Sequence, residues 1–267
     1  MIYGLYLSAS GVLTNSYRQD VIANNIANAE TVGFKRDLAL FQERLTEAQD
    51  RRFRGGGMSS GGSGGGARTN ELLEALGGGV FASPTAIDTK SGELEPTGNN
   101  LDLAIEGNEG YFMVQDHEGS ARLTRAGSFM VDDNGNLILS HSGDKVLDAN
   151  RKPIVLDGAL QAQTEVTKDG QITQAGHPMA RLGLFDVKDV SQLTKRGQML
   201  LDHPDVATLP ASTAQLRAGA VERANVDPTT ELSLLMDAQR QLEANANMIR
   251  YQDQTLQRLV NDVGKIG

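Results

Sequence analysis

Residues 21–36 read VIANNIANAETVGFKR, and this stretch decides how the N-terminal part of the chain is interpreted. It begins like a helix, yet Asn24, Asn25 and Asn28 fall within five positions. Each Asn costs a helix interior about 0.6 kcal/mol relative to Ala, because its amide competes for the backbone hydrogen bonds, and three cost about 2 kcal/mol. Such residues are expected only where something takes up their amides.

The asparagines end a helix that the sequence predicts from about Ile2 to Ala29. Spacings of three and four alternate along a narrow stripe of the coiled-coil type. The stripe consists of Ile2, Leu5, Ala9, Val12, Ser16, Gln19, Ala23 and Ile26. After Gly33, the spacing of Phe34, Leu38, Phe41 and Leu45 predicts a short second helix to about Ala48. We therefore expect an N-terminal helical segment over residues 1–48.

The composition changes twice in the middle of the chain. Residues 49–79 include the run RGGGMSSGGSGGG, which has too few apolar groups to offset its ordering entropy and is predicted to be a linker or loop. From residue 80 to 223 the period becomes two, as in LDLAIE (residues 101–106), and short alternating runs are separated by turns such as DDNG. Many short strands of this kind predict an antiparallel β-rich domain that folds by itself.

The last segment, residues 224–267, is predicted to be one long helix. It starts at Asp227-Pro228, an N-cap followed by proline at the first helical position. Leucine, isoleucine and valine then recur every seventh residue, at Leu235, Leu242, Ile249, Leu256 and Val263. A strict heptad buries a narrow seam against another helix, and the N-terminal stripe is the obvious partner. The expected fold is therefore α+β, with coiled-coil-like pairing of the terminal helices and an inserted antiparallel β-rich domain.

Composition narrows the function classes. The 267 residues are 39% hydrophobic and carry a net charge of −9, which argues against general binding to nucleic-acid phosphates. There are no cysteines, so disulfides, thiolate nucleophiles and cysteine-based metal sites are excluded. No stretch approaches the length of a membrane span, and the N-terminus does not resemble a cleaved secretory signal. We therefore expect a cytosolic protein, or one exported without a cleaved signal.

The patterns that would suggest chemistry have simpler explanations. GGSGG (residues 61–65) matches a nucleophile elbow, but it lacks the flanking strand and helix. Asp132 and its neighbours lack the distal glutamate of a calcium loop and read as a hairpin turn, and Arg51, Arg52 and Arg54 read as a solvated loop. The four histidines have no ligand spacing and are expected at the surface: His117, His141, His177 and His203. We predict no enzyme activity, no cofactor and no metal site.

Three blocks of sequence resemble the bacterial flagellar rod and hook proteins. The first joins MIYGLY (residues 1–6) to the asparagine-rich stretch with its T-x-G-F-K ending. The second covers residues 92–138, from GELEPTGNN to LTRAGSFMVDDNGNLI, and the third covers residues 219–260, from GAVERANVDP to the end of the heptad. The length of the chain and its middle block resemble those of the basal-body rod proteins of the FlgF and FlgG type, which belong to the proximal or the distal rod. Leu242 stands where many relatives carry an aromatic residue, and the glycine-rich segment differs from that of a distal-rod protein.

The resemblance implies a structural subunit that leaves the cell through the flagellar type III export apparatus and stacks with itself and other rod and hook subunits. The paired terminal helices would line a tube that crosses the periplasm and carries motor torque, without a membrane span of its own. Neighbouring subunits would then satisfy the amides of the asparagines, and Gly33 would make a sharp turn that lets Phe34 anchor the next segment. The expected motif and interface residues are Asn24, Asn25, Asn28, Gly33, Phe34, Leu235, Leu242, Asn245, Ile249 and Leu256. The alternative from another class is a secreted hydrolase or small-molecule-binding protein built on the β-rich domain.

Overall fold

The structure, a computed structural model, describes residues 2–43, 79–197 and 199–263. It divides into two compact units. The first consists of residues 1–23, 39–85 and 232–267, and the second of residues 24–38 and 86–231. The predicted linker at residues 49–78 lies outside the described residues.

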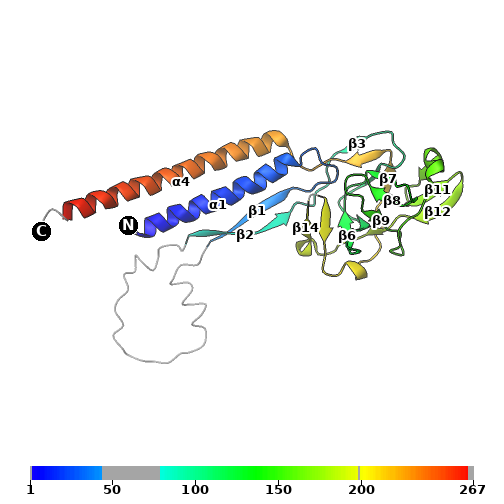
Figure 1. The fold of residues 1–267 in the computed structure, drawn as a ribbon, viewed down its shortest axis with the longest axis horizontal. Helices are drawn as coiled ribbons and strands as arrows, with labels where there is room; N and C mark the ends of the chain where they lie inside the picture. Colours follow the sequence, from blue (N-terminus) through cyan, green and yellow to red (C-terminus); the bar gives the residue numbers. More distant parts are fainter. Residues whose placement is uncertain (1, 44–78, 198, 264–267) are drawn as a thin grey trace, which may run out of the picture. The chain divides into compact units, whose positions relative to one another are not determined.

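The first unit contains the two long helices and most of a two-stranded sheet. Helix α1 spans Ile2–Ala27 and helix α4 spans Pro228–Val263, so the predicted terminal helices are confirmed. Strand β1 (Asp37–Glu43) pairs with β2 (Val80–Ile87). Figure 1 shows α4 running beside α1 in the opposite direction, with β1 and β2 along α1.

Strand β1 corrects the predicted second helix. The sequence DLALFQE fits both a helical spacing and a period of two, and such short apolar runs cannot be assigned by periodicity alone. The pairing with β2, about forty residues further along, decides in favour of a strand. Phe41 from this strand packs edge-to-face on Tyr17 of α1, with ring centroids 6.5 Å apart. Residues 44–48 of the predicted helix lie outside the described residues.

The buried face of α1 also differs from the predicted stripe. Ser8, Asn15 and Ile22, seven residues apart, are buried, whereas the predicted Ala23 is exposed and Leu5 and Val12 are half-buried. A stripe of small and polar residues escapes a search for hydrophobic periodicity. Coiled-coil pairing of α1 with α4 stays a prediction.

The second unit contains the β-rich middle of the chain, and every strand pair there is antiparallel, as predicted. Its largest sheet has eight strands in the order β14-β15-β6-β5-β9-β8-β7, with β13 beside β5. These strands are β5 (Tyr111–Gln115), β6 (Ala121–Thr124), β7 (Phe129–Val131), β8 (Leu137–Leu139), β9 (Lys145–Val146), β13 (Leu184–Phe185), β14 (Thr194–Arg196) and β15 (Leu200–Asp202).

Three smaller groups of strands complete this unit. One sheet contains β10 (Thr164–Val166), β11 (Gln171–Gln174) and β12 (His177–Arg181), after the short helix η1 (Gly158–Gln163). Two strand pairs join β16 (Leu216–Ala218) to β4 (Leu103–Ile105), and β17 (Ala220–Glu222) to β3 (Leu94–Pro96). The short helices η2 (Val190–Gln192) and η3 (Val206–Thr208) lie in the connections.

The core of the second unit lies between these sheets. The alternating residues predicted to share a face, Leu101, Leu103 and Ile105, are all buried in one apolar cluster with Phe112 and Phe129. A second cluster gathers around Tyr111, Met113 and Leu123. A third, small cluster joins Ala29 and Phe34 to Val226. Residues 24–36 of the asparagine-rich stretch thus belong to the same unit as the β-rich core.

Candidate functional site: the terminal junction

The amide of Asn25 is used within the chain, at the start of β1. Its side chain is 1% exposed. Asn25 Nδ2 donates to the Asp37 carbonyl at 2.9 Å, and Asn25 Oδ1 accepts from the Asp37 N–H at 2.9 Å. The amide therefore pairs with both backbone groups of Asp37 as a neighbouring strand would.

Asn28 is also satisfied locally. It is 2% exposed, donates from Nδ2 to the Asn24 carbonyl at 2.8 Å, and accepts from the Thr31 hydroxyl at 3.4 Å. The expectation that neighbouring subunits take up the amides is therefore wrong for Asn25 and Asn28. Asn24 is exposed, and its place in an interface stays a prediction.

Gly33 makes the sharp turn that the sequence predicts. Its φ is +70°, a left-handed conformation that favours glycine. A Cβ at this position would lie 2.2 Å from the backbone nitrogen of Ala126, and the Gly33 N–H donates to the Glu222 carbonyl at 2.8 Å. Only glycine allows this close approach. The next residue, Phe34, is 1% exposed and anchors the chain as expected.

Lys35 enters a buried group of charges. Its ammonium lies 2.7 Å from Glu222 Oε1 and donates to the Lys90 carbonyl at 2.7 Å. Arg125 Nη1 lies 3.3 Å from Glu222 Oε2 and donates to the Gly107 carbonyl at 2.9 Å. The Gly92 N–H also donates to Glu222 Oε1 at 2.9 Å. One carboxylate thus binds two cations and a backbone amide, all in the interior.

The electrostatics of this group follow from burial. The side chains of Glu222 and Arg125 are 0% exposed and that of Lys35 is 2% exposed. Burial lowers the pKa of Lys35, and the Glu222 carboxylate opposes this shift. Burial also raises the pKa of Tyr111, whose ring lies 4.9 Å from the Arg125 guanidinium carbon. Removing one member of a buried charge pair is costly, because the other remains without compensation.

Arg36 and Asp37 extend the same set of contacts. The Arg36 N–H donates to Asn225 Oδ1 at 2.7 Å, and the Arg36 guanidinium pairs with the buried Glu231 carboxylate. Asn225 in turn donates to the Asp88 carbonyl at 2.8 Å. The Lys195 ammonium lies 2.8 Å from Asp37 Oδ2.

Lys195 also covers Phe34, with its nitrogen 3.8 Å from the ring centroid. Burial lowers the pKa of this lysine, and its hydrogen bond with Asp37 opposes the shift. Every residue from Gly33 to Asp37 therefore has a specific partner in the second unit. We call residues 33–37, together with Glu222, Asn225 and Glu231, the terminal junction.

Helix α4 begins as the sequence predicts. Asp227 accepts from the Thr229 N–H at 3.1 Å and from the Thr230 hydroxyl at 2.5 Å, and Pro228 is the first helical residue. The hydrogen bond from Thr230 is the main cause that lowers the pKa of Asp227. The first turn of α4 also supplies Glu231 to the junction. Sequence motifs near the two ends of the chain thus meet in one place.

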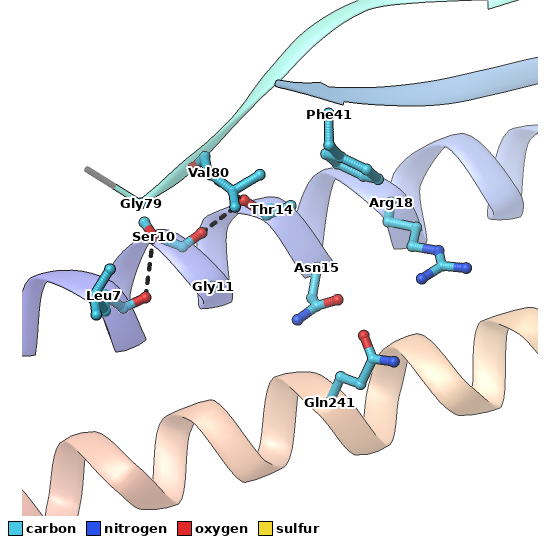
Figure 2. A pocket seen from close by; sticks show the side chains of 10 residues that line it. All are labelled: Leu7, Ser10, Gly11, Thr14, Asn15, Arg18, Phe41, Gly79, Val80 and Gln241. Carbon is cyan, nitrogen blue, oxygen red and sulfur yellow. Dashed lines mark hydrogen bonds between the residues drawn. The ribbon is translucent and has the colours of Figure 1, made fainter. Parts of the chain in front are cut away.

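The predicted residues of α4 lie in the first unit. Leu235, Leu242, Ile249 and Leu256 are all half-buried, whereas most of their neighbours on the helix are exposed. Asn245 is half-buried against Gly11 of α1. A cavity of about 360 Å³ lies beside this contact, lined by α1, β1, the start of β2 and Gln241 of α4 (Figure 2). Whether these residues contact other subunits stays a prediction.

The other candidate patterns of the sequence belong to a turn and to histidines that do not form a site. In a hairpin turn, Asp132 accepts from the side-chain amide of Asn136 and from the backbone N–H groups of Asn134 and Asn136. These bonds, the one from the Asn136 side chain above all, lower its pKa. His117, His141 and His177 are exposed, but His203 is buried and accepts from the Asp205 N–H, which corrects its predicted surface position.

Within the described residues, no group of three or more histidine, aspartate and glutamate side chains is arranged to hold a metal ion. In the same residues, neither long helix is apolar enough over its length to cross a membrane.

Comparison with known proteins gives three matches to family models. Residues 5–35 match the flagella basal body rod protein family. Residues 104–174 match the D1 domain of the flagellar hook proteins FlgE/F/G, and residues 217–262 match the C-terminal domain of the flagellar basal body rod FlgEFG proteins. The first match contains residues 33–35 of the terminal junction, and the third contains Glu222, Asn225 and Glu231.

Individual relatives match over nearly the whole chain. The flagellar basal-body rod protein FlgG of Bacillus subtilis is 32% identical, over 98% of this chain and 99% of its own length. The flagellar basal-body rod protein FlgF of Caulobacter vibrioides is 31% identical, over 98% of both chains. FlgG of Borreliella burgdorferi is 28% identical, over 96% of this chain and 97% of its own.

Proposed function

Because the chain belongs to the flagellar basal-body rod protein family, it is a structural subunit and not an enzyme, and we propose that it polymerises through its terminal helices into the shaft that transmits motor torque. Its place is the basal body of the flagellum, where it assembles with other rod and hook subunits. Nothing in the comparisons favours the alternative of a secreted hydrolase or binding protein.

The exposed apolar side chains of the two helices support assembly through this unit. Leu13 of α1 is 73% exposed, and Tyr251 and Val260 of α4 are each 66% exposed. Met236 and Met248 of α4 are about half exposed. Apolar residues on several faces of a helix pair are what a subunit needs if its helices pack against those of its neighbours. In the proposed rod these side chains are covered.

The terminal junction supports the mechanical part of the proposal. A shaft that carries torque needs the inner ends of its terminal helices fixed. Here ion pairs to buried carboxylates, together with hydrogen bonds, hold the segment that follows α1 and the first turn of α4. We further propose export through the flagellar type III apparatus without a cleaved signal. The resemblance to rod proteins implies this route.

A matched pair of substitutions tests the role of the helices. Leu13→Asp places a charge on the exposed face of α1, whereas Met179→Asp does the same on strand β12, where Met179 is 49% exposed. In a strain that lacks the native gene, we expect Leu13→Asp to abolish swimming and to be absent from purified basal bodies. Met179→Asp should swim normally.

The amount of each variant exported into the medium is measured in parallel, which separates failed export from failed assembly. Normal swimming with Leu13→Asp present in basal bodies would contradict assembly through the helices. A deletion strain that swims without the protein would contradict the rod function itself.

A further inference from the structure

Two glycines of α1 lie directly under amide side chains of α4. A Cβ at Gly4 would lie 2.6 Å from Gln252 Nε2, and a Cβ at Gly11 would lie 2.6 Å from Asn245 Nδ2 and 3.1 Å from Asn245 Cγ. Glycine weakens a helix interior relative to alanine, so local helix preference does not explain either residue. The contacts do explain them, because each glycine leaves room for a bulky side chain of the other helix.

The two contacts define an antiparallel register. Seven residues along α1, from Gly4 to Gly11, correspond to seven residues back along α4, from Gln252 to Asn245. The next equal step places Arg18 opposite Ala238. Ala238 is 0% exposed. Figure 2 shows Arg18 and Asn15 extending from α1 on the side where Gln241 of α4 lies.

The sizes of the facing residues are complementary at the two observed contacts, and the third pair, which follows from the same step of seven, continues the pattern. The small residue belongs to α1 in the first two steps and to α4 in the third. We propose that this arrangement determines the register of α1 against α4. This proposal rests on the role proposed above for the terminal helices. Its test measures the formation of a disulfide and not motility, so the two proposals can fail separately.

The hydrophobic heptad cannot set this register by itself. Leu235, Leu242 and Ile249 repeat every seven residues, so a shift of seven brings one apolar residue to the place of another. The same shift destroys the size match. In one direction it places Arg18 against Asn245, two bulky polar side chains, and in the other it places Gly11 against Ala238, two small residues with a gap between them. Polar or size-matched positions commonly fix register in helix pairs.

Engineered disulfides can read the register, because the full chain contains no cysteine. Gly11→Cys with Asn245→Cys reports the observed register, since a Cβ at Gly11 would lie 3.1 Å from Asn245 Cγ, the atom that the sulfur of the second cysteine replaces. Gly4→Cys with Asn245→Cys reports a shift of one heptad. In the purified full-length protein under mild oxidation, we expect the first pair to form an intramolecular disulfide about ten times faster or more than the second. Non-reducing gels and mass spectrometry distinguish it from a disulfide between two chains.

A size swap tests which residues set the register. Ala238→Arg places two arginines face to face, so the Gly11–Asn245 disulfide should form about ten times more slowly. The Gly4–Asn245 disulfide should form faster, because in that register the new side chain faces Gly11. Adding Arg18→Ala restores one small and one large residue and should restore the first disulfide. Ala244→Arg, at an exposed position of α4, is the matched control and should change neither rate.

Three results would overturn the proposal. An unchanged Gly11–Asn245 rate in Ala238→Arg would mean that the register is set elsewhere, for example by the terminal junction. A lack of rescue by Arg18→Ala would mean that the loss reflects general disruption of α4. Disulfides only between chains, or none in any pair, would mean that the two helices do not pair in this way within one chain.

Discussion

Replacing Gly33 by alanine should destabilise the second unit far more than the same change at another left-handed glycine. Gly33 has φ +70° and Gly98 has φ +76°, so alanine meets the same backbone strain at both positions. That strain costs about 1–2 kcal/mol, and the stiffening of the unfolded chain by alanine offsets part of it equally in both variants. The difference between the variants therefore reports what surrounds each glycine.

The surroundings differ sharply. A Cβ at Gly98 has nothing within 4 Å, whereas a Cβ at Gly33 would lie 2.2 Å from Ala126 N and 2.5 Å from Ala126 Cα. These are backbone atoms, so the two segments must separate, and the 2.8 Å hydrogen bond from Gly33 to Glu222 is lost. A buried group without its partner costs about 1–3 kcal/mol. We expect Gly33→Ala to lose about 3 kcal/mol of unfolding free energy and Gly98→Ala about 1 kcal/mol, the first combining both costs.

Urea unfolding followed by near-ultraviolet circular dichroism measures this difference, because Tyr111 lies in the core of the second unit. With a slope of about 2 kcal/mol per molar urea, the two midpoints should differ by about 1 M. Equal midpoints for the two variants would refute the reasoning, since the contact of Gly33 with Ala126 would then contribute nothing.

Three further comparisons follow from the junction and the cap. Asn25→Ala should lower the free energy of unfolding by about 1–3 kcal/mol, because the Asp37 N–H and carbonyl lose their partners. Asn24→Ala, at an exposed position, should be neutral or slightly stabilising, and equal urea midpoints for the two variants would argue against the intrachain role of Asn25. Glu222→Gln should lower the free energy of unfolding by about 3–5 kcal/mol, because it leaves two buried cations unpaired. Lys35→Met should cost less, because Arg125 stays paired with Glu222, and the reverse order would contradict the assignment of Glu222 as the centre of the group. Because the pKa of Asp227 is lowered, its stabilising effect is present above the ordinary pKa of 3.8 and is lost as the pH falls through the lower value in the folded protein. In thermal melts, the Asp227→Asn variant should therefore lose less stability on acidification than the native chain, and identical acid profiles would contradict this.

The sequence predicts those features whose physical cause is local. The N-cap and proline at Asp227-Pro228 predict the start of α4 because capping involves residues within one turn. Gly33 predicts a turn because few other residues adopt a positive φ. The alternation of Leu101, Leu103 and Ile105 predicts a buried face because the strand period is two.

Features that depend on distant partners escape sequence reasoning. Lys35 and Glu222 are 187 residues apart, and neither stands in a pattern that indicates the other. The strand β1 needs β2, and Asn25 needs Asp37 folded back onto it. The β-rich domain predicted to start at residue 80 also differs from the compact unit of the structure, which contains residues 24–38 and 86–231. Residues 24–38 belong to that unit because of the contacts of the terminal junction. The residues that make these contacts are distant in the sequence and meet only in the folded chain.

Electron cryomicroscopy of basal bodies purified from cells that express this protein tests the central proposal most directly. We predict a rod in which the α1 and α4 helices of successive subunits pack together around the central channel, with Leu13 and Tyr251 buried between subunits and the β-rich units outside. A rod in which these helices face solvent, or in which subunits contact one another only through their β-rich units, would contradict it.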